Sequence, residues 1–224
     1  MAKPFIPAAS LRGRSVFWGE ERKQEPRFAP LATPGFSPLP SGLPRGCLVE
    51  IVGRRSSGRT ATMLYLLACA TSTGETCAVV DLHNQFPPES ATQAGVDLNR
   101  LVWVRCEGKT ELALRSADLL LQAGGFGMIA LDLCEADPKA LHRLPVSSWY
   151  RLQRAVEHTS TTFLLCADSA QAKSCAGLHL ELAQREVVWA GTALFPTLQE
   201  ISTHVAVREK AAPRLHTLPI REVV

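Results

Sequence analysis

Five short runs of apolar residues alternate along the chain with stretches of helical periodicity. The runs CLVEIV, TCAVVD, LVWVR, MIALDL and TTFLLCAD have few polar interruptions, which is typical of strands buried on both faces of a parallel sheet. Between them, apolar residues recur at helical spacing, and we expect helices at residues 61–74, 90–94, 110–122 and 147–158. The alternation predicts an α/β fold whose mostly parallel sheet is flanked by helices.

The C-terminal part of the chain follows a different pattern. REVVWAG, ISTHVAVRE and RLHTLPIRE are strand-like, and no helical stretch separates them. Consecutive strands without crossover helices pair antiparallel. We therefore expect an antiparallel extension at one edge of the sheet.

The first 45 residues hold eight of the fifteen prolines. Proline breaks helices and removes a backbone donor, so this segment is expected to be largely extended, with one short helix near residues 14–24. We accordingly divide the chain into a proline-rich, basic N-terminal arm at residues 1–45 and a core domain at residues 46–224.

Charge separates the same two segments. The arm carries seven Lys and Arg against three Asp and Glu, whereas the remainder carries 17 against 18, for a net charge of +3 in the whole chain. A neutral core argues against a large nucleic-acid-binding face, because neutralising phosphates requires clustered cations. Any DNA contact is expected to be weak or indirect.

Composition favours a cytoplasmic protein. No apolar run approaches the length of a membrane span, and the N-terminal segment lacks the apolar region of a secretory signal. The seven cysteines never form a CxxC pair, which argues for buried reduced thiols. Without such a pair, neither a zinc ribbon nor a disulfide framework is expected. The six histidines also lack the spacing of metal ligands, so no metal site of their own is expected.

One loop carries recognisable chemistry. It follows the first strand, opens the first helix and has the spacing G-x-x-x-x-G-K-[ST] of a phosphate-binding loop, with arginine in place of lysine. Glycines let such a loop curl so that its N–H groups face a phosphate. The nucleotide-binding candidates in the loop are Gly53, Arg54, Arg55, Ser56, Ser57, Gly58, Arg59 and Thr60.

A second candidate completes this site. Asp132 ends the strand MIALDL, where an aspartate beside a phosphate loop would bind Mg²⁺ together with the Thr60 hydroxyl. Arg59 keeps the positive charge of lysine, but its guanidinium is wider and planar, so the exchange is not conservative. Whether nucleotide binds is left open by these residues alone.

Several segments together resemble the core of the bacterial recombinase RecA. They are GLPRGCLVEIVGRRSSGRT, CAVVD, AGVDLNRL and GMIALDL, in this order, and the resemblance covers residues 42–168, with REKAAP as a looser match near the C-terminus. It implies a RecA-like phosphate-loop core.

The chain departs from that family where catalysis depends on it. The resemblance places His83 where the family has its catalytic glutamate, and Arg59 where it has the loop lysine. We expect no ATP hydrolysis, with ATP and Mg²⁺ bound without turnover or not at all. The family's two interface lysines correspond to Arg208 and Lys210, its DNA-binding loop to a short segment with Lys173 as a cation, and its C-terminal domain is expected to be missing.

Short RecA-like chains with a degenerate phosphate loop and a proline-rich head resemble ImuA. That resemblance implies an accessory role in SOS-induced, error-prone translesion DNA synthesis. The implied partners are an ImuB-like Y-family protein, a replicative-type error-prone polymerase and, as a third candidate, RecA itself.

Two other functions stay open. One is an active DNA-dependent ATPase of the recombinase type, and the other is a cell-division inhibitor resembling SulA. Trp18 on the basic arm is a candidate anchor in a partner's groove, alongside Arg208 and Lys210 as partner-contact candidates.

Overall fold

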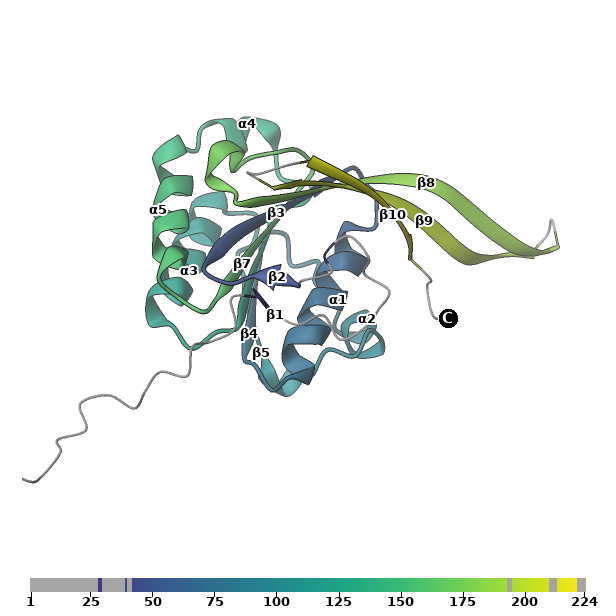
Figure 1. The fold of residues 1–224 in the computed structure, drawn as a ribbon, viewed down its shortest axis with the longest axis horizontal. Coiled ribbons are helices and arrows are strands. Elements are labelled where there is room, and N and C mark those ends of the chain that lie inside the picture. Colours follow the sequence, from purple (N-terminus) through teal and green to yellow (C-terminus); the bar gives the residue numbers. More distant parts are fainter. Residues whose placement is uncertain (1–27, 30–38, 40–41, 193–194, 210–212, 221–224) are drawn as a thin grey trace, which may run out of the picture.

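The computed structural model describes residues 28–29, 39, 42–192, 195–209 and 213–220. Its main sheet has eight strands in the order β10-β9-β8-β3-β7-β6-β4-β5 (Figure 1). The strands from β3 to β8 are mutually parallel, and β9 and β10 are antiparallel to their neighbours. Their bounds are β3 Cys47–Gly53, β4 Cys77–Asp81, β5 Leu101–Arg105, β6 Met128–Asp132, β7 Thr162–Ala167, β8 Leu178–Thr192, β9 Phe195–Glu209 and β10 Pro213–Ile220.

Helices cover both faces of the parallel part of the sheet (Figure 1). One apolar cluster lies between the sheet and α1, and a second lies between the sheet and α3 with α5. Burial on both faces explains why the sequences of β3, β4, β6 and β7 are almost continuously apolar. The run LVWVR differs from the expectation, because β5 lies at the edge of the sheet and is largely exposed. The helices are α1 Arg59–Ser72, α2 Pro88–Gln93, α3 Thr110–Ala123, α4 Pro138–His142 and α5 Val146–Glu157, with 3₁₀ turns η2 Leu98–Arg100 and η3 Lys173–Cys175.

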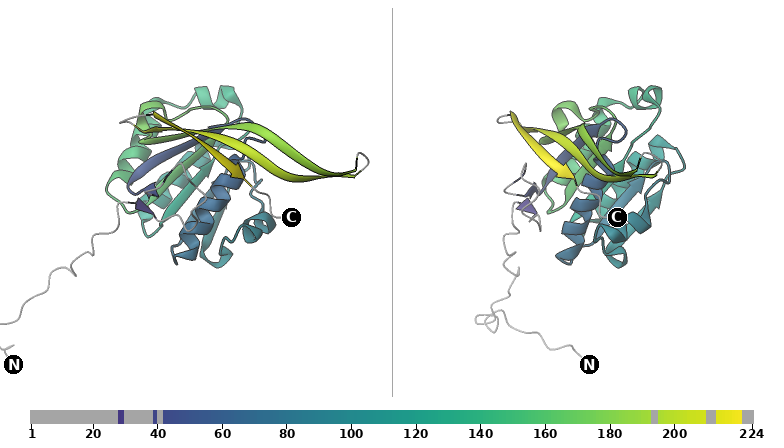
Figure 2. Two further views of the ribbon diagram at one scale, coloured as in Figure 1. Left: turned by 45° about the vertical axis from the view of Figure 1, so that its right-hand side comes forward. Right: turned by 90° about the vertical axis from the view of Figure 1, so that its right-hand side faces the viewer.

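This architecture confirms the predicted fold class, including the antiparallel strands at one edge. Two details differ from the sequence-based expectation. The short helix α4 was not predicted, and β8 begins at Leu178, whereas only its second half, from Arg185, was expected to be a strand. The distal parts of β8 and β9 project from the body as a two-stranded ribbon (Figures 1 and 2).

Part of the segment assigned to the arm contributes to the body. Leu39 and Leu43 are buried in the same apolar cluster as α1. The short strand β1 (Phe28–Ala29) pairs with β2 (Leu43–Pro44). Arg45 then donates to the carbonyl oxygens of Gly127 and Ser160 and pairs with Glu75, which fixes the entry of the chain into β3. Core packing thus begins before residue 46.

The part of the chain that the structure describes contains no helix long and apolar enough to cross a membrane. Trp18 and Lys210, and the helix expected near residues 14–24, lie outside the described residues.

Candidate phosphate-binding site

The structure places the loop Gly53–Thr60 between the carboxyl end of β3 and the first turn of α1. Its curl depends on left-handed backbone at Ser56 (φ 59°) and Gly58 (φ 90°). The Ser57 N–H donates to the Arg54 carbonyl at 3.1 Å, and the Thr62 N–H donates to the Gly58 carbonyl at 2.8 Å. The segment therefore has the strand–turn–helix geometry of a phosphate loop.

Gly53 allows the loop to pack closely against the neighbouring strand β8. A Cβ at this position would lie 2.6 Å from the carbonyl oxygen of Leu182 and would also collide with the Ser57 side chain. On the other side, the buried Thr203 hydroxyl on β9 donates to the Ser57 carbonyl at 3.1 Å. The antiparallel strand β9 is thus hydrogen-bonded to the phosphate loop.

Arg59 forms an ion pair with Asp168, the residue that follows β7. The side chain of Arg59 is only 7% exposed, whereas that of Asp168 is 45% exposed. Burial alone would lower the pKa of Arg59, but the hydrogen bond to Asp168 and nearby negative charge raise it above its ordinary value. The cation of the loop is thus permanently charged and is already neutralised by a carboxylate of the same chain.

A second ion pair extends this arrangement. The backbone N–H of Glu135 donates to the other Asp168 oxygen at 3.0 Å, and the Glu135 carboxylate accepts two hydrogen bonds from Arg55, at 2.8 and 2.9 Å. We call Arg55, Glu135, Asp168 and Arg59 the arginine–carboxylate network. It joins the phosphate loop to the segments that follow β6 and β7.

The predicted magnesium ligands lie at the same carboxyl edge of the sheet. Asp132 ends β6 and accepts the N–H of Cys134 at 2.9 Å, while Thr60 lies in the first turn of α1 with its side chain exposed. Burial raises the pKa of Asp132, although the hydrogen bonds from Cys134 and the charge of Arg59 act in the opposite direction.

These residues fit a magnesium nucleotide only in part. A carboxylate and a hydroxyl are suitable Mg²⁺ ligands, and the loop backbone is suited to a phosphate. The guanidinium of Arg59 is not available to the phosphates, because it is buried against Asp168. A bound phosphate would have to compete with that carboxylate for the guanidinium.

His83 lies in the turn that follows β4. Its N–H donates to Asp81 at 3.2 Å, and the next residue, Asn84, has left-handed backbone (φ 60°). The buried Asp81 also accepts hydrogen bonds from the Phe86 N–H and the Trp103 indole, so it organises this turn. The His83 Nε2 atom is buried without a hydrogen-bond partner among the described residues.

The loop after β7 is held by a buried carboxylate on the phosphate-loop strand. Glu50 is fully buried, accepts the N–H groups of Gln171 (2.6 Å) and Ala172 (2.9 Å), and pairs with His179 at 2.9 Å. His179 in turn contacts the carbonyl of Lys173. The segment that resembles a DNA-binding loop is therefore short and fixed at its centre.

Among the other candidates, Arg208 lies on β9 and pairs with Glu181 at 3.2 Å, with both side chains exposed. It does not join the arginine–carboxylate network. Within the described ranges, no group of three or more His, Cys, Asp or Glu side chains could hold a metal ion.

Sequence reasoning missed Asp168 and Glu135. Asp168 follows an apolar strand at the same sheet edge as Asp132, and this position was a signal that could have identified it. Glu135 reaches the site through a left-handed turn (φ 63°), which the sequence pattern did not indicate.

Comparison with known proteins agrees with this geometry. Residues 39–141 match the family model of the RecA N-terminal domain. Protein RecA of Rickettsia massiliae is 38% identical over 91 residues, which are 41% of this chain and 26% of that protein. Protein RecA of Cutibacterium acnes is 41% identical over 100 residues, which are 44% of this chain and 28% of that protein.

The matched region of the chain is thus RecA-like in sequence, and the fold agrees with a RecA-like core. The match spans only about a quarter of the length of these RecA proteins.

Proposed function

We propose that this protein is a RecA-like accessory protein of SOS-induced, error-prone translesion DNA synthesis, similar to ImuA, and that it acts by binding other proteins. Its expected partners are an ImuB-like Y-family protein, a replicative-type error-prone polymerase and RecA. In this role the RecA-like core is a docking scaffold, and its phosphate loop does not turn over nucleotide.

The observation that carries the proposal is the ion pair between Arg59 and Asp168. Phosphoryl transfer depends on cations that are free to stabilise the charge of the transferred phosphate. Here the loop cation is already bound to a carboxylate, and the turn after β4 presents His83 where the resembling family has a glutamate. The paired arginine removes the free cation, and the histidine removes the carboxylate, that hydrolysis in the resembling family would use.

ATP and Mg²⁺ would act, if they bind, as ligands without turnover. Thr60 and Asp132 would hold the metal, whose charge would help the nucleotide to compete with Asp168. Because that competition opposes binding, we expect weak affinity.

Affinity capture of the tagged protein from DNA-damaged native cells, with partners identified by mass spectrometry, tests the proposed role. Recovery of a Y-family-like protein or a replicative-type polymerase is the expected result. Recovery of the tubulin-like division protein, or of no partner, would contradict it. A rate of ATP hydrolysis that Thr60→Ala abolishes would favour the DNA-dependent ATPase instead.

A further inference from the structure

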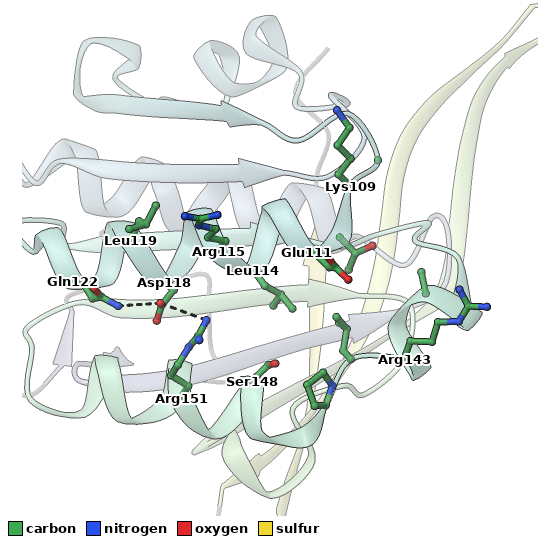
Figure 3. A pocket seen from close by; sticks show the side chains of 15 residues that line it. Lys109, Glu111, Leu114, Arg115, Asp118, Leu119, Gln122, Arg143, Ser148 and Arg151 are labelled. Atoms are coloured by element: carbon green, nitrogen blue, oxygen red, sulfur yellow. Dashed lines mark hydrogen bonds and ion pairs between the residues drawn. The ribbon is translucent and has the colours of Figure 1, made fainter.

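A groove of about 860 Å³ runs between α3 and α5, on the opposite face of the sheet from α1 (Figure 3). Lys109 and Glu111 lie toward one end of it, and Gln122 lies at the other (Figure 3). Arg143 and Leu144, which follow α4, also line the groove. The groove is separate from the phosphate loop, none of whose residues lines it.

The groove presents apolar side chains to solvent. Leu114 forms part of its floor and Leu119 is 56% exposed, with Leu144 and Pro145 lining it from the segment before α5. Among the seven large apolar side chains that are exposed in the described residues, Leu119 is the one that lines the groove. Exposed apolar side chains in a groove are typical of protein-binding surfaces.

The charges around the groove are predominantly positive. Four cations line it against two carboxylates: Lys109, Arg115, Arg143 and Arg151, with Glu111 and Asp118. Asp118 is only 8% exposed, and its charge is balanced by Arg151 at 3.4 Å and by a hydrogen bond from Gln122 at 2.9 Å (Figure 3). Lys109 also pairs with Glu107 at 3.3 Å. Among the described residues, the lining charges without an ion-pair partner are therefore those of Arg115, Arg143 and Glu111.

Asp118 also leaves one acceptor unused. Its Oδ1 atom is buried and has no hydrogen-bond partner among the described residues. An unsatisfied buried acceptor costs free energy, so Asp118 is held beside the groove at some cost to stability.

We propose that the α3–α5 groove binds an acidic amphipathic helix of a partner protein. A groove between two helices suits a third helix whose apolar side chains recur at i, i+3 or i+4, and i+7. The 14 residues of α3 span about 21 Å, which corresponds to an occupant of about four turns. Asp or Glu beside its apolar stripe would complement Arg115 and Arg143.

Nucleic acid is the other class of occupant that cations attract. The apolar side chains of the groove favour a protein, because a phosphate backbone gains nothing from Leu119 or Leu144. The identity of the partner rests on the proposed function, whereas the binding of an acidic helix in the groove does not. An experiment can therefore contradict one of these proposals without contradicting the other.

A peptide-display selection tests the proposal with the full chain. The probe is a library of 16-residue peptides with leucine at i, i+3, i+4 and i+7 and all other positions randomised, selected against the wild-type protein. We expect enriched peptides to be net negative and to become helical on binding. We expect Leu119→Ser and Arg143→Glu each to weaken their binding about tenfold.

Two control variants distinguish the effect of groove residues on binding from the effect of similar residues elsewhere on α3 and α5. Leu112→Ser changes another exposed leucine on α3, and Arg154→Glu changes another exposed arginine on α5, and neither residue lines the groove. Both should bind within about twofold of wild type. Circular dichroism melts confirm that all four variants fold.

Three outcomes would overturn the proposal. These are the absence of net-negative peptides among the enriched sequences, equal binding by groove and control variants, or binding of a single-stranded oligonucleotide that is lost in Arg143→Glu but kept in Leu119→Ser. If the peptides bind as expected while affinity capture recovers no translesion partner, the groove stands and the proposed function falls.

Discussion

At Arg59 a buried cation depends on one carboxylate. Replacing Asp168 with alanine leaves the guanidinium 7% exposed and without its ion-pair partner. Because a buried charged donor without a partner is costly, we expect the free energy of unfolding to fall by about 1–3 kcal/mol. Urea denaturation followed by circular dichroism measures this loss.

Arg55→Ala is the control for that prediction. The Arg55 side chain is 79% exposed, so its ion pair with Glu135 should contribute less than about 1 kcal/mol. Equal losses in the two variants would mean that Asp168 has no special role in holding Arg59.

Arg59→Lys by itself should not produce ATP hydrolysis. The lysine would restore the ordinary residue of a phosphate loop, but Asp168 would remain beside it and His83 would still lack a carboxylate. Phosphate release, measured with and without single-stranded DNA, should stay at the background of Thr60→Ala. Turnover in the single variant would show that His83 is not a catalytic defect.

His179 makes stability depend on pH in a defined direction. The hydrogen bond to Glu50 raises the pKa of His179 above 6.5, its ordinary value. The stabilisation from the charged imidazole is therefore fully present below about pH 6.5 and is lost as the pH rises through the raised pKa of the folded state. Melting temperatures should fall between pH 6 and pH 8, and more in wild type than in His179→Gln.

Parallel slopes of melting temperature against pH in the two proteins would contradict this assignment. Glu50 also accepts two backbone hydrogen bonds, so His179→Gln removes the imidazole and leaves these contacts of the carboxylate in place.

At the scale of elements, the junction of β3, β8 and the loop depends on Gly53. Gly53→Ala should lower the free energy of unfolding by about 1–3 kcal/mol, because the new Cβ would lie 2.6 Å from the Leu182 carbonyl oxygen. Chemical denaturation measures the change. Ser57→Ala should be nearly neutral, since the Ser57 hydroxyl has no hydrogen-bond partner among the described residues.

The double variant Gly53→Ala with Ser57→Ala distinguishes the two collisions. It should remain as unstable as Gly53→Ala, because removing the hydroxyl does not move the carbonyl of β8. Rescue by the second change would locate the strain in the loop rather than between the strands.

The sequence predicted the strands that consist of a continuous apolar run. It did not predict elements that are too short or too irregular to show a periodic pattern. The strands β3, β4, β6 and β7 are predominantly apolar because both faces of the sheet are covered there. The five-residue helix α4 is too short to show periodicity, and the first half of β8 follows a loop whose end the sequence did not mark.

The candidate site was predictable in position but not in its electrostatics. The glycine spacing of the loop and the strand-end Asp132 placed it at the carboxyl edge of the sheet. The pairing of Arg59 with Asp168 joins residues on elements far apart in the sequence, so it required the strand order.

For the whole molecule, the N-terminal boundary can be tested by truncation. Removing residues 1–27 should leave the melting temperature within about 2 °C, because it spares Phe28, Leu39 and Leu43. Removing residues 1–45 should lower it by roughly 5–15 °C, since two buried leucines and the Arg45 contacts are lost. Differential scanning calorimetry of both proteins makes the comparison.

The shorter truncation also tests the arm as a docking element. Loss of partner capture with an unchanged melt would assign residues 1–27, including Trp18, to partner binding. A large fall in its melting temperature would instead show that the arm stabilises its own core.

The central place of β3 in the sheet also governs how the protein is made. β3 is an early strand in the chain, yet its partners begin only at Thr162 in β7 and Leu178 in β8. At roughly 5–20 residues per second, a ribosome needs on the order of ten seconds to supply them. During that interval CLVEIV is an unpaired apolar strand on the nascent chain, where chaperones that bind extended apolar segments should act.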